Sequence, residues 1–351
     1  ATATTVFDPA RLILISSTSM WWDAAMGSTM VVNVSTLGKA MCVSLARRVN
    51  STAVNRRTFL AFTVVAFATA GLSACSRPAP EPNHTLVSLA EQARTDAAAL
   101  APVRSDLAAI RERHATMLST EVERDCGHFE NGSVPDSCVS TTSPSATTTT
   151  SATAAAHAEP NAVLKAALDQ VNSLLADIPA DSAVVVARIH TELAILTMAA
   201  PPAFDQNNNI TPTAADSDQV KKALEWEYAT IYGLEVHEAF VANELASTLN
   251  DALDEHRSIA TALRMGLESA NVSDIPVAEA GYTINDVKNS GFFADSASQS
   301  VLAWHDYASH ASDASWRALC IRIASTIAVT AVPALEFAGI EPWRADFLQL
   351  N

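Results

Sequence analysis

Glycine and proline are scarce in this sequence. Its 351 residues include only 10 glycines and 15 prolines. A turn-rich β-sandwich needs more of both at its many tight turns, and a collagen-like chain needs glycine at every third position. The plentiful alanine and leucine are instead good helix formers. The composition therefore predicts an all-α protein, and the length is enough for two domains of ordinary size.

Basic residues are also few. The chain has 22 Lys and Arg against 38 Asp and Glu, a formal net charge of −16. Proteins that bind nucleic acid through its phosphates need clustered Lys and Arg, so we expect no nucleic-acid partner. There is also no Gly-rich phosphate loop, no Cys-x-x-Cys pair and no Gly-x-Ser-x-Gly elbow. These absences leave no catalytic residue to name and favour a non-enzymatic role, with enzymatic activity left open.

The five cysteines are too few for a disulfide scaffold. Cys126 and Cys138 bound a short loop rich in Gly, Asn, Pro and Ser, where a metal site would find only His128 as a further ligand. We therefore predict a disulfide between Cys126 and Cys138, which stabilises the fold by about 3 kcal/mol. Cys320 lies in an apolar helical pattern and is predicted to be a buried thiol.

Long hydrophobic runs are rare, and the most distinctive one lies at residues 58–74. It is about as long as the apolar core of a signal peptide and short for a membrane span. Arg56 and Arg57 precede the run, and it leads into the sequence LSAC, whose cysteine is Cys75. The paired arginines resemble a twin-arginine export signal. The ending resembles a lipobox, in which the cysteine is acylated after cleavage.

This resemblance predicts a lipoprotein signal at 41–74, lipidation of Cys75, and a protein anchored on the outer face of the cytoplasmic membrane. An uncleaved N-terminal anchor and an ordinary secretory signal are the alternatives. Residues 1–40 do not fit a signal peptide and are predicted to be an unstructured upstream extension. Without residues 1–74, 16 basic and 36 acidic residues remain. Anionic headgroups would repel such a protein, so its attachment would depend on the lipid itself.

The rest of the sequence predicts two helical parts. A Pro-rich tether at 75–83 leads into a helical region at 84–200, which a Ser/Thr-rich linker at 137–160 interrupts. This region is predicted to hold three helices, with Pro102 as a break or restart within the first.

Residues 216–351 carry the stronger pattern. Short loops there favour antiparallel neighbours, and the long segment 273–291 is expected to cross the bundle. The apolar spacing predicts four helices, at 218–242, 244–270, 294–312 and 313–337.

Each of three predicted helices carries one ionisable residue in an otherwise apolar stripe. These residues are Glu227, His256 and His305. Because an unpaired buried charge is unfavourable, we expect them to pair with one another, or with Arg257 or Arg317.

The C-terminal part resembles a known family. Glu227 opens the stretch EYATIYG, the pair His256-Arg257 follows one helix later, and Trp316-Arg317 and a Pro-Trp pair come near the end. These residues are similar to the ferritin-like domain of unknown function found on exported actinobacterial proteins. The resemblance covers about 217–342. It implies a ferritin-like four-helix bundle preceded by a helical segment, and it implies no established activity.

The sequence departs from a di-iron site. Ferritin-like di-iron bundles carry Glu-x-x-His pairs, and residues 216–351 contain none. Glu227, His256 and His305 could still hold one metal ion, with iron or zinc as the metals that such ligands suit. The simpler interpretation is a hydrogen-bonded polar cluster that fixes the register of the helices without any cofactor.

Two functions follow from these patterns. The favoured one is a lipid-anchored extracytoplasmic accessory module that binds a protein partner in the cell envelope and contacts the membrane through its lipid. The alternative is a metal-binding ferritin-like protein with a mononuclear or degenerate di-metal site and oxidoreductase activity. If Glu227, His256 and His305 converge within metal-ligand distance of a common point, metal binding is favoured. If they do not, the accessory module is favoured.

Overall fold

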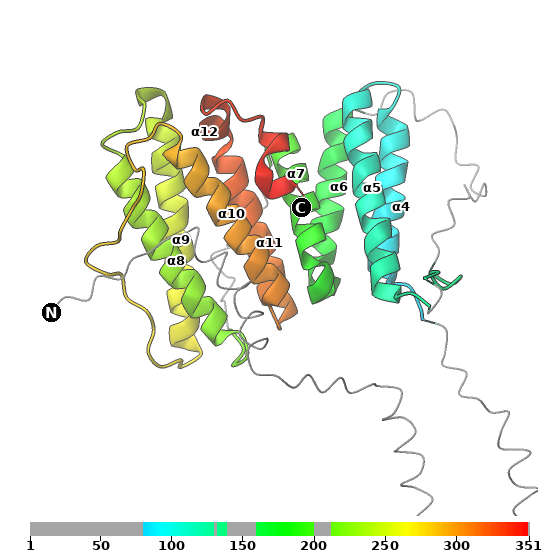
Figure 1. Ribbon diagram of the computed structural model, residues 1–351, viewed down its shortest axis with the longest axis horizontal. Coiled ribbons are helices and arrows are strands. Elements are labelled where there is room, and N and C mark those ends of the chain that lie inside the picture. The colour runs from blue at the N-terminus through cyan, green and yellow to red at the C-terminus, as the bar shows by residue number, and fades with distance from the viewer. Residues whose placement is uncertain (1–79, 130–131, 139–158, 200–211, 350–351) are drawn as a thin grey trace, which may run out of the picture. The chain divides into compact units, whose positions relative to one another are not determined.

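The computed structural model describes residues 80–129, 132–138, 159–199 and 212–349 (Figure 1). The described residues form helices and connecting segments, with no strand among them, so the predicted all-α class is confirmed. They belong to one compact unit. None of the helices in these ranges is both long and apolar enough to cross a membrane.

The first two helices form a hairpin. Helix α4 spans His84–Leu100 and helix α5 spans Ser105–Cys126. The Asn83 side chain accepts hydrogen bonds from the backbone N–H groups of Thr85 and Leu86, each 3.1 Å long, and thereby caps α4. A turn at 101–104 that contains Pro102 separates the two helices. The described residues of 84–200 therefore form four α-helices, and the prediction of three is wrong because this break reverses the chain.

Helices α6 (Pro160–Leu174) and α7 (Ala183–Thr197) complete the N-terminal part. Helix α7 packs against α5 and α6 on one side and against α10 and α11 on the other (Figure 1). A helix enclosed in this way is apolar around most of its circumference. Ten of its residues are buried: Ala183, Val186, Ala187, Ile189, His190, Thr191, Glu192, Leu193, Ala194 and Ile195.

The C-terminal part holds the four predicted helices with altered ends. They are α8 (Ser217–His237), α9 (Ala246–Ser269), α10 (Phe292–His310) and α11 (Ala314–Thr330). The last predicted helix is divided, because α12 (Val332–Phe337) begins separately just before Pro333, which cannot donate a backbone hydrogen bond. The long segment after α9 returns along the bundle, so that α9 and α10 run in the same direction (Figure 1).

Two buried polar side chains tie distant segments together. The carboxylate of Asp216 accepts hydrogen bonds from the backbone N–H groups of Ser312 and Asp313, at 2.7 and 2.9 Å, and so joins the start of α8 to the α10–α11 turn. Arg317 donates to the carbonyl oxygens of Ile178 and Ala311, at 2.6 and 3.1 Å. One hydrophobic core runs from α4 to α12, and α7 is the helix that links its two parts.

Candidate functional site

Glu227 lies at the centre of the first polar cluster in the core. It is buried on the face of α8 that also carries Val220 and Leu224. One carboxylate oxygen, Oε2, accepts a 2.6 Å hydrogen bond from His256 Nδ1 of α9. The other, Oε1, accepts a 2.9 Å hydrogen bond from Trp304 Nε1 of α10. The structure therefore pairs Glu227 with His256, and both oxygens of the buried carboxylate have partners.

The charge of Glu227 controls the protonation of His256. Burial by itself would lower the pKa of the imidazole, but the adjacent carboxylate outweighs burial and raises the pKa of His256. Both side chains are buried. Together with Trp304, the pair holds α8, α9 and α10 in register, provided that neither partner is removed.

Glu255 is a second carboxyl group beside this pair that the sequence analysis did not select. Its Oε2 accepts a 2.8 Å hydrogen bond from Thr330 Oγ1 at the end of α11, and its Oε1 is buried without a hydrogen-bond partner. Burial, with a smaller contribution from Glu227, raises the pKa of Glu255 to about 7. Its position next to His256 in the chain is the one signal that could have identified it.

His305 belongs to a different cluster. Its Nε2 shares a 3.1 Å hydrogen bond with Thr191 Oγ1 of α7. Thr191 shares a hydrogen bond with Ser325 Oγ of α11, which in turn shares one of 2.6 Å with His190 Nδ1. Consecutive helical residues point about 100° apart. Trp304 can therefore face Glu227 while His305 faces α7.

Both histidines of this second cluster are neutral near pH 7. Burial lowers the pKa of His305 to about 3, with smaller contributions from Arg188 and His190. Burial also lowers the pKa of His190 to about 3, with a contribution from Arg322. His190 was not predicted as part of this cluster, because the sequence places it in the helical region at 84–200, apart from the bundle predicted at 216–351.

A third cluster joins α4, α5 and α7. Arg111 donates to the Asp96 carboxylate through Nε and Nη2, at 3.1 and 2.8 Å, and to His114 Nδ1 through Nη1, at 2.9 Å. His114 Nε2 then donates to Glu192 Oε2 at 2.8 Å. Arg113 forms an ion pair with the same carboxylate. Arg111 and His114 lie between the buried residues Leu107 and Leu118 at the three- and four-residue spacing of one helix face, and this pattern could have identified them.

Of the two pairings that were expected, the one between Glu227 and His256 occurs, and the alternative pairing with Arg257 or Arg317 does not. Arg257 is exposed and binds Glu235 and Asp254. Arg317 is buried, but its guanidinium donates to backbone carbonyl oxygens. Trp304 of α10 supplies the second hydrogen bond to Glu227 instead.

The predicted metal ligands are only partly brought together. Glu227 and His256 are hydrogen-bonded to each other, and His305 is hydrogen-bonded to Thr191 of α7. Within the described ranges, no group of three or more His, Cys, Asp or Glu side chains is arranged to hold a metal ion. The iron or zinc site of Glu227, His256 and His305 therefore stays a prediction.

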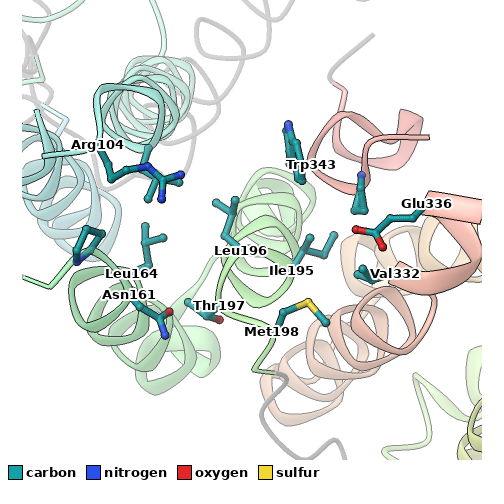
Figure 2. A pocket seen from close by; sticks show the side chains of 13 residues that line it. Arg104, Asn161, Leu164, Ile195, Leu196, Thr197, Met198, Val332, Glu336 and Trp343 are labelled. Carbon is teal, nitrogen blue, oxygen red and sulfur yellow. The ribbon is translucent and has the colours of Figure 1, made fainter. Parts of the chain in front are cut away.

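A cleft of about 590 Å³ lies at one end of α5, α6 and α7. Figure 2 shows the last turn of α7 between two walls, with Arg104 and Leu164 on one side and Glu336 and Trp343 on the other. Thirteen residues line it: Arg104, Leu107, Pro160, Asn161, Leu164, Ile195, Leu196, Thr197, Met198, Val332, Glu336, Pro342 and Trp343. Apolar side chains predominate, and polar ones stand among them.

The remaining predicted residues divide into two groups. The structure contains the disulfide between Cys126 and Cys138, with the two Cα atoms 6.2 Å apart, and Cys320 is a buried free thiol. Arg56, Arg57 and Cys75 lie outside the described residues, so the export signal and the lipidation site stay predictions.

Comparison with known proteins yields one match. A family described as "Domain of unknown function (DUF4439)" matches residues 219–339, which include α8 to α12. No curated protein and no solved structure matches the chain. The match covers the part in which Glu227, His256 and His305 lie, and it assigns no activity to them.

Proposed function

We propose that this protein is an exported, lipid-anchored accessory module of the cell envelope that binds a protein partner through the cleft. The lipid would be carried by Cys75, on the outer face of the cytoplasmic membrane. The body would be a ferritin-like bundle, since such folds combine two antiparallel helix pairs with one long connection. The N-terminal helices would extend this bundle rather than form a separate domain.

The cleft is the observation that carries the proposal. Its rim exposes large side chains, with Met198 59% exposed and Trp343 42% exposed. Aromatic residues and methionine are enriched at protein interfaces, where they supply contact area and adapt to the partner. Small polar groups such as Asn161 and Thr197 stand among the apolar ones and can bind a backbone.

We take the occupant to be an extended, mainly apolar peptide segment of an envelope protein. The walls come from four different helices and one short turn, which leaves an open trough rather than an enclosed pocket. The apolar residues at its base favour apolar side chains of the partner. Arg104 and Glu336, on opposite walls, favour a segment with polar ends.

The buried ionisable groups support a binding role over a chemical one. Glu227, His256, Asp96, Arg111 and His114 all have their hydrogen bonds within the protein. Groups held in this way stabilise the packing of helices. They would have to give up these bonds to act on a substrate.

A matched pair of exposed methionines provides the test. Met198 lies in the cleft and Met265 on α9, and they are 59% and 58% exposed. A photo-crosslinking residue placed at each position in cells should give a discrete adduct from position 198 and none from position 265. The partner is then identified by mass spectrometry and purified. Its affinity for Trp343→Ala should fall about tenfold or more, the loss expected for a central aromatic residue.

Two results would contradict the proposal. One is an equal yield of the same adducts from both positions. The other is an unchanged affinity of the purified partner for a Trp343→Ala variant that has the helical content and thermal stability of the wild type.

Metal binding is the second candidate function. The predicted ligands Glu227, His256 and His305 are of types that suit iron and zinc, and Glu227 and His256 lie within hydrogen-bonding distance of each other. A metal would displace the hydrogen bond between Glu227 and His256, and redox activity would depend on its identity. Metal analysis of the wild type and of variants at Glu227 and His256 tests this alternative.

A further inference from the structure

The start of the described chain is fixed to the disulfide loop. Ser137 Oγ donates a 2.7 Å hydrogen bond to the carbonyl oxygen of Pro80, and Cys138 Sγ lies 3.4 Å from the same oxygen. The disulfide joins Cys138 to Cys126 at the end of α5. The chain therefore enters the fold at a point that is held to the C-terminal end of α5.

Chain length then limits where the proposed lipid can be. Five peptide units link Cys75 to Pro80. Because an extended chain advances at most about 3.6 Å per residue, these units span at most about 18 Å. Helix α5 has 22 residues and is about 33 Å long. A lipid on Cys75 therefore brings the disulfide end of the α4–α5 hairpin close to the bilayer, whereas the other end of α5 is about 33 Å further along the helix and is not held there by the tether.

From this geometry we infer that the described part of the disulfide loop (126–129 and 132–138) is the surface that docks on the lipid bilayer, with Phe129 as its apolar contact. The inference rests on the proposed lipid anchor at Cys75. It adds an orientation to that proposal, because the cleft begins at Arg104 and Leu107, at the other end of α5. The cleft would face away from the membrane and remain accessible to a partner.

Phe129 suits this role by its exposure and its backbone. Its side chain is 55% exposed. Its backbone N–H donates to the Ser133 carbonyl oxygen and its carbonyl oxygen accepts from Gly132 N–H, each at 2.8 Å, so the ring stands on a hydrogen-bonded turn. Large apolar side chains of this kind insert into the boundary between headgroups and acyl chains.

The charges near the loop indicate which lipids it contacts. Asp125 and Asp136 lie within or beside it, Glu81 lies next to Pro80, and Arg124 is paired with Glu121. This acidic end is repelled by anionic headgroups. Docking therefore depends on the short tether and on Phe129, and it is strongest on zwitterionic lipid.

The experiment uses the full lipoprotein, purified from its export route and reconstituted in phosphatidylcholine vesicles. Phe129→Trp reports on the docking surface. Val103→Trp is the matched control, because Val103 is 46% exposed in the turn at the opposite end of the hairpin. Flotation of the vesicles measures anchoring. Quenching by brominated phosphatidylcholine, corrected for the native tryptophans, measures contact with the acyl chains.

We expect wild type and both variants to float with the vesicles. Since interfacial side chains sit about 5–10 Å into the boundary, quenching of Phe129→Trp should exceed that of Val103→Trp by about threefold or more. Insertion of about ten Gly and Ser residues before Pro80 relaxes the constraint and should reduce the quenching.

Failure of the anchor and failure of the docking are distinguishable. If the wild type does not float, the proposed lipid anchor is wrong and the orientation falls with it. Floating protein in which both positions are quenched equally, or in which neither is quenched, leaves the anchor in place and overturns the docking surface.

Discussion

Two buried histidine–glutamate pairs in this protein have the same chemistry and opposite pKa shifts. Glu227 raises the pKa of His256 above its ordinary value, against the effect of burial. In the other pair, burial lowers the pKa of His114 despite its hydrogen bond to Glu192. The difference lies in the second ring nitrogen of His114. Arg111 donates to Nδ1, and the positive charges of Arg111 and Arg113 oppose protonation.

The comparison shows that a hydrogen bond to a carboxylate does not by itself set the charge of a histidine. His256 has one strong neighbour, a carboxylate, and favours the imidazolium form. His114 bridges a guanidinium and a carboxylate, and only the neutral ring can accept from one and donate to the other. We expect substitutions at these neighbours to change the two pairs in different ways.

The largest effect is expected for Arg111→Met. The substitution leaves the buried carboxylate of Asp96 without its ion-pair partner and with only the hydrogen bond from Gln92, so the free energy of unfolding should fall by about 3–5 kcal/mol. It should also raise the pKa of His114, because a donor to Nδ1 and a positive charge are both removed. Urea denaturation measures the first change and NMR titration of the ring the second. Arg104→Met is the control, since that exposed arginine pairs only with Asp106 and its loss should change little.

A smaller effect is expected for Glu227→Gln. The variant keeps the shape of the side chain but removes its charge, so we expect a loss of about 1–3 kcal/mol and a lower pKa for His256. Glu235→Gln, at an exposed position on the same helix, is the control. If the two variants were equally stable, the Glu227 cluster would not be holding the bundle together.

The pH dependence of stability should have opposite signs for the two pairs. Because the pKa of His256 is raised in the folded protein, its protonation stabilises the fold fully below about pH 6.5. This stabilisation is lost as the pH rises through the pKa of His256 in the folded protein. Because the pKa of His114 is lowered in the folded protein, the neutral ring contributes fully to stability above about pH 6.5, and this contribution is lost as the pH falls. His190 and His305, each with a pKa of about 3, act in the same direction as His114. NMR titration should show His256 protonated and His114 neutral at pH 6.5, and titration of both near that pH would contradict this assignment.

The smallest effect is expected for Glu255→Gln. Because the pKa of Glu255 is raised to about 7, the folded protein binds a proton that the unfolded chain releases near pH 4.5. Wild-type stability should therefore fall as the pH rises from about 4.5 to 7. The variant should lose this part of the slope and be slightly more stable than wild type above pH 7. Thermal unfolding across this pH range measures it, and an unchanged slope would show that Glu255 is ordinarily ionised.

Much of the bundle follows from its sequence pattern. The apolar stripes locate four C-terminal helices, and the polar interruptions at Glu227 and His256 identify two side chains that do meet. These features are readable because helical periodicity is local and a buried charge needs a partner nearby.

What the pattern missed depends on contacts between distant segments. His305 pairs with Thr191, more than a hundred residues away, because α7 inserts against α10 and α11. Periodicity shows that a face is buried but does not name the helix that covers it. The cluster of Asp96, Arg111, His114 and Glu192 was missed as a set for the same reason, since the spacing on α5 marks Arg111 and His114 as buried but does not show that Asp96 on α4 and Glu192 on α7 are their partners.

The central claim is that the ionisable residues inside the bundle hold its helices together, while binding takes place at the cleft. The most direct test is metal analysis by mass spectrometry of the exported protein, purified without chelator beside its Glu227→Gln and His256→Gln variants. We expect far less than one equivalent of metal in all three proteins. Near-stoichiometric iron or zinc in the wild type, lost in both variants, would contradict it.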